Sequence, residues 1–179
     1  MDTLNIIVEE IISVLSKIDS KQLENVVDSI SKDSRIFVDG EGRSGLMGKG
    51  FAMRLMHLGY RVYSVGETIT PAVLKNDIYF SISGSGESGN VALNTKKAKE
   101  KGCNIIAVTS KAGSTIGSLA DILIVVPGTT KGDSGEQRKS VQLLSSLFDQ
   151  SLHIVLDALC LLLSKKDNVS NNEATAKHW

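Results

Sequence analysis

The sequence predicts an α/β fold in which helices cover both faces of a parallel β-sheet. The first observation is that short apolar runs alternate with segments of helical periodicity after residue 35, as consecutive βαβ units do. The second is that two of these runs lead into the same glycine-rich motif, G-x-G-x-S-G, at residues 40–45 and 84–89. Loops of this kind lie beyond the carboxyl ends of parallel strands, which is where such sheets bind their ligands.

Two amphipathic helices are predicted before the sheet. Apolar residues recur at helical spacing from Leu4 to Ile18 and from Leu23 to Ile30, where Ser20 is the expected N-cap of the second helix. Five apolar runs then suit strands buried on both faces: residues 36–38, 62–65, 78–82, 105–108 and 122–126. Further helices are predicted over residues 44–58, 88–101, 114–120 and 141–163.

The chain is predicted to form a single domain over residues 1–179. Its 179 residues are 41% hydrophobic, which is enough to bury one core, and no linker or low-complexity tract interrupts them. We divide the domain into N-terminal helices at residues 1–33, an α/β core at 34–164 and a polar tail at 165–179. The tail is expected to be mobile unless a partner subunit holds it.

Charge and cysteine content argue against several classes of function. Lys+Arg and Asp+Glu both number 20, so the net charge of zero gives no electrostatic basis for binding nucleic acid or an acidic membrane. Cys103 and Cys160 lack metal-ligand spacing and are typical of small residues in a reducing compartment. The N-terminus lacks the basic region of a signal peptide, and no apolar run is long enough to span a bilayer. We therefore expect a cytoplasmic protein.

The duplicated motif indicates a site for a small phosphorylated polyol. Glycines let backbone N–H groups approach an anion closely, and the helix that follows each loop presents its positive N-terminal end to that anion. The serine of each motif adds a hydroxyl donor for a phosphate or sugar oxygen. Two such loops at neighbouring strand ends would form one polar site.

Other interpretations of the loops stay open at this point. Glycine can serve a strand-to-helix turn for steric reasons alone. The first loop could also be a dinucleotide fingerprint, because Glu67 lies about 20 residues beyond it, where an acidic ribose ligand would be expected. The serine content of both loops and the presence of the second loop argue against this. Neither loop matches the P-loop of nucleotide triphosphatases or the nucleophile elbow of hydrolases.

A few charged residues are candidates for ligand binding or catalysis. Arg43 lies inside the first loop and could neutralise a phosphate, whereas Lys49 is more typical of a solvated helix position. His57 falls near the end of the helix after that loop, where a histidine often serves the helix dipole. Asp149 and His153 are four residues apart, which suits either a surface pair or a positioned acid and base.

Several strings of the sequence together are more specific than either glycine loop. The G-E-G-R-S-G loop is followed by F-A-M-R-L-M-H-L-G at residues 51–59, V-G-E-T-I-T-P at 65–71 and I-S-G-S-G-E-S at 82–88. In this order they resemble the sugar isomerase (SIS) domain family, and within it the 6-phospho-3-hexuloisomerases. The resemblance extends over nearly the whole chain.

The resemblance implies a fold, an assembly and a reaction. The fold is a three-layer αβα domain with a five-stranded parallel sheet, and the assembly is a homo-oligomer, most often a tetramer. The reaction interconverts D-arabino-hex-3-ulose 6-phosphate and D-fructose 6-phosphate through an enediol, in formaldehyde fixation by the ribulose monophosphate pathway. Neither a metal ion nor an organic cofactor is implied.

The resemblance also assigns site residues. Ser83, Ser85 and Ser88, with the backbone around Gly84, are expected to hold the phosphate, and Arg43 and Ser44 to lie against the sugar.

The family's general base is a glutamate in a string like G-S-L-F-E-Q, and the matching residue here is Asp149 in S-L-F-D-Q. Aspartate is one methylene shorter than glutamate, so either the site closes slightly or another carboxylate takes the proton. Glu67 is the alternative candidate for this role. The apolar neighbours Leu147 and Phe148 are expected to favour the protonated form of Asp149 by partial desolvation. His57 is the expected acid or ring-opening group. The residues Lys177-His178-Trp179 depart from the C-terminal pattern of the family.

Three alternative functions are weighed against this one. A non-catalytic sugar-phosphate sensor of the same family would usually carry a DNA-binding domain, for which the residues before the first strand are too few and insufficiently basic. An arabinose 5-phosphate-type aldose-ketose isomerase would often carry an additional C-terminal module. A dinucleotide-binding oxidoreductase would be stabilised against heat by NAD.

Overall fold

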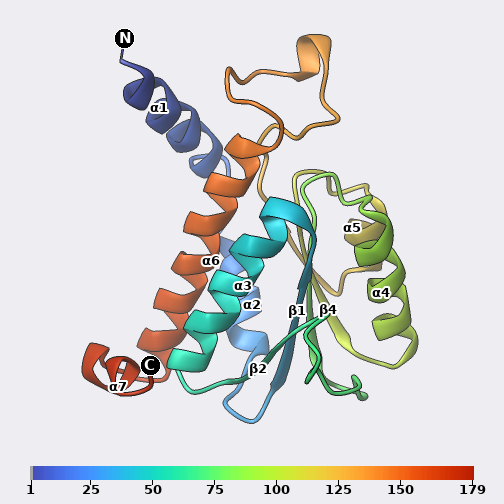
Figure 1. The fold of residues 1–179 in the computed structure, drawn as a ribbon, viewed down its shortest axis with the longest axis vertical. Coiled ribbons are helices and arrows are strands. Elements are labelled where there is room, and N and C mark those ends of the chain that lie inside the picture. The colour runs from blue at the N-terminus through green and yellow to red at the C-terminus, as the bar shows by residue number, and fades with distance from the viewer. Residues whose placement is uncertain (1) are drawn as a thin grey trace.

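A computed structural model of the protein describes residues 2–179 and shows a central sheet between two layers of helices (Figure 1). The strands are β1 (Arg35–Gly40), β2 (Arg61–Ser64), β3 (Ile78–Ile82), β4 (Asn104–Thr109) and β5 (Ile122–Val125). They are all parallel and are ordered β2-β1-β3-β4-β5. The predicted three-layer αβα fold with a five-stranded parallel sheet is confirmed.

The helices divide unequally between the two faces of the sheet (Figure 1). One face carries α1 (Thr3–Leu15), α2 (Ser20–Ser29), α3 (Gly42–His57) and α6 (Ser146–Lys166), which enclose the larger apolar core with one side of the strands. The other face carries α4 (Gly89–Glu100) and α5 (Thr115–Leu119), each packed on β4. The central strands β1, β3 and β4 are therefore buried on both faces, as their continuous apolar runs predicted.

The strand order places both glycine-rich loops together. From β1 the chain crosses to β2 on one side, whereas β3 pairs with β1 on the other side, so β1 and β3 flank a topological switch point. Gly40 pairs with Ile82, and Ile82 pairs with Val108, so these three strands end at one level. The loops that follow β1 and β3 consequently lie side by side at the carboxyl edge of the sheet.

The start of α6 differs from the prediction. The long C-terminal helix was expected from residue 141 but begins at Ser146. Leu144 has a φ of 53°, a left-handed conformation that cannot continue an α-helix, and the side chains of Val141 and Leu143 are largely exposed. The guanidinium group of Arg138 donates hydrogen bonds to the carbonyl oxygens of Gln142 and Leu144, which stabilise this irregular segment.

One local expectation near the N-terminus was also wrong. The N-cap of α2 is Asp19 rather than Ser20, because the Asp19 carboxylate accepts a hydrogen bond from the backbone N–H of Lys21. The polar tail contains α7 (Asn171–Thr175), whose capping box joins Ser170 and Glu173. Its two hydrogen bonds satisfy backbone N–H groups at the start of this helix.

Among the described residues, α6 alone is long and apolar enough to cross a membrane. Of its most apolar stretch, 56% is buried inside the protein, where the helix packs against α1, α2 and α3. A core helix that is covered on most sides needs this composition.

Candidate active site

The first loop is a tight turn from β1 into α3. A Cβ atom added to Gly45 would lie 2.4 Å from the carbonyl oxygen of Gly40, so this contact requires glycine. Gly42 has a φ of 57° and opens α3, whose N-terminal end faces the second loop. The Glu41 carboxylate accepts a hydrogen bond from Asn90 of α4 over 2.6 Å, which ties the two loops together.

The second loop is held by its own serine side chains. Ser83 is buried, and its hydroxyl oxygen accepts a hydrogen bond from the N–H of Gly86 and lies 2.9 Å from Oγ of Ser88. Gly86 has a φ of 71°, and a Cβ atom there would lie 1.9 Å from Oγ of Ser114. Ser85 lies at the tip of the loop and accepts from the N–H of Glu87. The loop is therefore fixed before any ligand arrives.

Asp149 lies in the first turn of α6, and its carboxylate meets the first loop. The Ser44 hydroxyl donates a hydrogen bond to Oδ1 of Asp149 over 2.6 Å. Only 2% of Asp149 is exposed, and this burial raises the pKa of the carboxyl group, although the hydrogen bond from Ser44 and the charge of Arg43 oppose the rise. The direction agrees with the partial desolvation expected from the sequence. A carboxylate of this kind is suited to accept a proton from carbon.

Arg43 connects the N-terminal ends of α3 and α6. Its guanidinium group donates a hydrogen bond to Oγ of Ser146, the first residue of α6, over 2.9 Å. Together with the bond from Ser44 to Asp149, this contact brings two helix N-termini to one place. Each contributes a positive partial charge to the region around the carboxylate.

A cavity of about 310 Å³ lies between these elements. It brings together seven of the nine predicted site residues: Arg43, Ser44, Ser83, Gly84, Ser85, Ser88 and Asp149. Its wall also contains residues that were not singled out from the sequence: Glu41, Gly42, Thr130, Lys131, Leu144, Ser145 and Ser146. Several of these belong to the segment between β5 and α6, where the Pro127-Gly128 break and the polar residues after it were the available signal.

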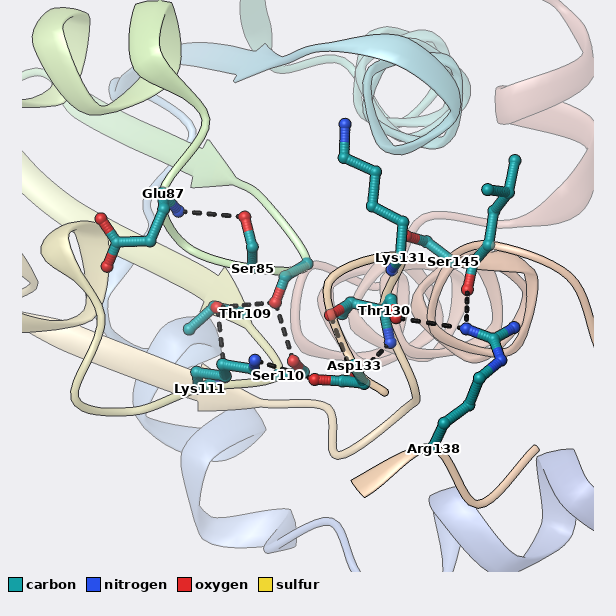
Figure 2. A network of polar contacts seen from close by, with 12 residues as sticks. Ser85, Glu87, Thr109, Ser110, Lys111, Thr130, Lys131, Asp133, Arg138 and Ser145 are labelled. Carbon is teal, nitrogen blue, oxygen red and sulfur yellow. Dashed lines mark hydrogen bonds and ion pairs between the residues drawn. The ribbon is translucent and has the colours of Figure 1, made fainter. Parts of the chain in front are cut away.

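Polar contacts hold the first part of that segment against the sheet (Figure 2). The Asp133 carboxylate accepts hydrogen bonds from the N–H and hydroxyl groups of Thr130 and forms an ion pair with Lys111 over 2.8 Å. The N–H of Lys131 donates to Oγ of Ser145 over 3.1 Å. The backbone of Thr130 and Lys131 is therefore fixed from both sides.

The same segment is also attached to α1. Glu10 accepts hydrogen bonds from the Ser140 hydroxyl, the Val141 N–H and the Gln142 amide. These hydrogen bonds lower the pKa of Glu10 despite its partial burial. A second cavity, of about 610 Å³, lies between the segment and α1, and Lys139 is part of its wall.

His57 does not lie near Asp149 within one chain. It ends α3, thirteen residues after Ser44, which is about 20 Å along the axis of a regular helix. The residue is 3% exposed, and its ring lies against the ring of His178, with centroids 5.2 Å apart. Burial, followed by the neighbouring His178 and Arg54, lowers the pKa of His57.

Glu67 also lies outside the cavity. It follows β2 at the edge of the sheet and forms an exposed ion pair with Lys49 over 2.7 Å. The hydrogen bond and charge of Lys49 lower the pKa of Glu67, which is the wrong direction for a base that works near neutral pH. His153 faces Asp157 at 3.7 Å on the surface of α6, rather than Asp149.

No group of three or more His, Cys, Asp or Glu side chains in residues 2–179 is arranged to hold a metal ion. The hydrogen-bond donors around the cavity are hydroxyl groups, backbone amides, Arg43 and Lys131, and the carboxylates of Glu41 and Asp149 are acceptors. Hydroxyl, amide and cationic donors suit a polyol that carries a phosphate.

Comparison with known proteins assigns the family. The sequence model of the SIS domain matches residues 29–156, most of the chain. The chain belongs to the SIS domain family. The match covers all five strands, both glycine-rich loops and the first half of α6, including Asp149. The family expected from the sequence is thereby confirmed.

Several relatives of this SIS protein align over nearly their full length. An uncharacterized protein of Archaeoglobus fulgidus is 38% identical over 98% of this chain and 96% of its own. The 3-hexulose-6-phosphate isomerase of Bacillus subtilis is 36% identical over 96% of this chain and 93% of its own. A crystal structure of a hypothetical protein from Methanococcus jannaschii, described as inferring a function of 3-hexulose-6-phosphate isomerase, superposes with a TM-score of 0.84 at 33% identity, covering 100% of this chain and 98% of that one.

Proposed function

We propose that this protein is a 3-hexulose-6-phosphate isomerase, which interconverts D-arabino-hex-3-ulose 6-phosphate and D-fructose 6-phosphate. The observation that carries the proposal is the buried Asp149 carboxylate, which Ser44 engages through one oxygen in a cavity that also contains the serine-rich second loop. A base for a C–H proton and donors for a phosphate are thus available to one small molecule. The name of the Bacillus subtilis relative supports the same enzyme class.

The proposed reaction moves a carbonyl group between C3 and C2 without a net change in oxidation state. Asp149 removes the proton from C2 of the 3-ketose, the electron pair of that C–H bond forms the C2–C3 double bond, and the former carbonyl oxygen O3 takes up a proton, which the later loss of the O2 proton balances, to give an enediol. Protonation at C3 by the same carboxyl group, and loss of the O2 proton, then give the 2-ketose. Ser44 holds Oδ1 of Asp149, so Oδ2 is the oxygen proposed to exchange the proton.

Arg43 and the two helix N-termini are proposed to stabilise the charge that develops on the enediol oxygens. The guanidinium group lies beside the first turn of α6, and the amides of α3 begin at Gly42. Donors that are already oriented need little rearrangement as charge develops. The raised pKa of Asp149 brings the carboxyl group closer to the pH at which it must alternately accept and release a proton.

We further propose that the enzyme is a homo-oligomer, most simply a tetramer, that works in the cytoplasm in the ribulose monophosphate pathway of formaldehyde fixation. Leu4, Val8 and Ile12 form an exposed apolar stripe along α1, and Leu46 and Met53 are exposed on α3. Apolar stripes of this kind support burial against other copies of the chain. The two cysteines are free and buried, which is consistent with a reducing compartment.

His57 keeps its proposed role as an acid or ring-opening group only if it acts across a subunit boundary. Within one chain its ring is separated from Asp149 by nearly the whole length of α3. A neighbouring copy could bring its own His57 to this cavity if the tail around His178 moves aside. The proposal therefore links this residue to assembly.

The direct test is an assay of the purified protein with D-arabino-hex-3-ulose 6-phosphate in the presence of a chelator. We expect fructose 6-phosphate to form without added metal. Turnover of arabinose 5-phosphate instead would favour the aldose-ketose alternative. Thermal stabilisation by sugar phosphates without turnover of either substrate would favour a sensor, and stabilisation by NAD alone would favour an oxidoreductase.

A further inference from the structure

We propose that Lys131, in the segment between β5 and α6, is the cation that binds the phosphate group of the substrate. The inference rests on the proposed function and adds a specificity-determining residue to it. Lys131 belongs to the wall of the same cavity as Ser83, Ser85 and Asp149. None of the ion pairs found among residues 2–179 includes its ammonium group.

The backbone of Lys131 is held by hydrogen bonds, although its side chain is exposed. Its N–H group is bound to Ser145 at the start of α6, and the preceding Thr130 is bound to Asp133, which Lys111 holds in turn. Figure 2 shows the Lys131 side chain extending away from this network, on the side where α3 lies. A cation on a backbone held at both ends loses less conformational freedom on binding than one on a mobile loop.

The segment also lies against the phosphate loop itself. A Cβ atom added to Gly84 would lie 3.1 Å from Cγ2 of Thr130 and 3.0 Å from the ring of Phe148. The residue next to Lys131 therefore packs directly on the first glycine of the serine-rich loop. Lys131 and the serines of that loop accordingly belong to the wall of one cavity.

The charges of the cavity leave this role open for Lys131. Ser83, Ser85, Ser88 and the backbone amides are neutral donors, whereas a sugar phosphate carries nearly two negative charges at neutral pH. Arg43 already donates a hydrogen bond to Ser146, and its charge acts on Asp149. Lys131 is the other cation of the cavity wall, and a flexible ammonium group suits a phosphate as a point charge.

The test is the affinity of the full-length protein for fructose 6-phosphate and for inorganic phosphate, measured by titration calorimetry. We expect Lys131→Met to weaken both by roughly tenfold or more, and Lys131→Arg to restore most of the affinity because the charge returns. Lys139→Met is the matched control, because Lys139 lies in the same segment but on the other cavity. It is expected to bind like the wild type.

Steady-state kinetics separate a phosphate contact from a catalytic one. The Lys131→Met variant is expected to raise KM by roughly tenfold while kcat stays within about threefold. Unchanged affinities, or a loss of kcat at unchanged KM, would overturn the assignment to the phosphate. If the wild type itself binds no sugar phosphate, the proposed function fails and this inference fails with it. If the wild type binds and Lys131→Met binds equally well, only the inference fails.

Discussion

The hydroxyl group of Ser44 donates a hydrogen bond of 2.6 Å to Oδ1 of Asp149, across 105 residues of sequence. This contact shows how the site accommodates an aspartate where its family resemblance implies a glutamate. The shorter carboxylate is brought into direct contact with the first loop by the packing of α3 on α6. One of its oxygens is oriented by Ser44, and the other is available for chemistry.

Removal of that hydroxyl group should change the pH dependence of turnover. The hydrogen bond from Ser44 lowers the pKa of Asp149, against the effect of burial, so Ser44→Ala should raise this pKa further. Because the base must be deprotonated, the acidic limb of a kcat/KM profile should move to higher pH. Ser118→Ala, an exposed serine on α5, is the control. An active Ser44→Ala enzyme with an unmoved acidic limb would contradict the role of this pair.

The two candidate bases can be separated by isosteric substitution. We expect Asp149→Asn to reduce kcat by roughly 10² to 10⁴-fold, since an amide cannot take the proton. Glu67→Gln should retain activity within about threefold, because Glu67 lies outside the cavity in an exposed pair with Lys49. Asp157→Asn, on the surface of the same helix as Asp149, controls for effects on α6. The opposite ranking of the first two variants would transfer the role of base to Glu67.

Mixed oligomers test whether His57 acts from a neighbouring subunit. If one site takes Asp149 from one chain and His57 from another, His57→Asn and Asp149→Asn should each be impaired alone. Co-refolding equal amounts of the two variants should then restore about a quarter of the sites. Each site draws an intact Asp149 with a chance of about one half and an intact His57 with the same chance. Absence of recovery would exclude the shared site. A fully active His57→Asn enzyme would remove the histidine from the mechanism.

Gly86 should tolerate no side chain. Its φ of 71° disfavours other residues, and a Cβ atom would lie 1.9 Å from Oγ of Ser114. We expect Gly86→Ala to lower the free energy of unfolding by roughly 1–3 kcal/mol and to weaken phosphate binding, because the second loop must shift. Gly113→Ala is the control, since a Cβ atom there has no neighbour within 4 Å. Equal urea midpoints for the two variants would show that the loop adapts freely.

Asp167 should stabilise the C-terminal tail in a pH-dependent way. Its carboxylate accepts a hydrogen bond from the Tyr60 hydroxyl and forms an ion pair with Lys32 at 3.1 Å. Burial alone would raise the pKa of Asp167, but these contacts outweigh burial and lower it. Because the pKa of Asp167 is depressed in the folded state, its contribution to the free energy of unfolding is complete above the usual pKa of an aspartate. That contribution is lost as the pH falls through the pKa of the folded state. Asp167→Asn should therefore cost about 1 kcal/mol of unfolding free energy at pH 7. The difference from wild type should shrink in urea titrations near pH 3, and a constant difference would contradict the ionic origin.

Local patterns were enough to predict the parts of the protein whose conformation depends on neighbours in sequence. The alternation of apolar runs and helical segments gave the parallel sheet, because strands buried on both faces must be continuously apolar. The glycines at positions 40–45 and 84–89 revealed the two loops, since tight turns before a helix leave little room for side chains. The strings around these loops are typical of the family whose sequence model matches residues 29–156.

Only the tertiary structure decided which distant residues meet. Packing of α3 on α6 joined Ser44 to Asp149 and, by the length of α3, separated both from His57 in the same chain. The tertiary structure also keeps Leu144 in a left-handed conformation, so that α6 begins later than predicted. It places Lys131 in the wall of the cavity as well. Sequence periodicity records how a segment is buried but carries no information on the direction in which an irregular segment returns to the core. The site therefore follows from two loops that the sequence specifies locally and a third wall that only the folded chain positions.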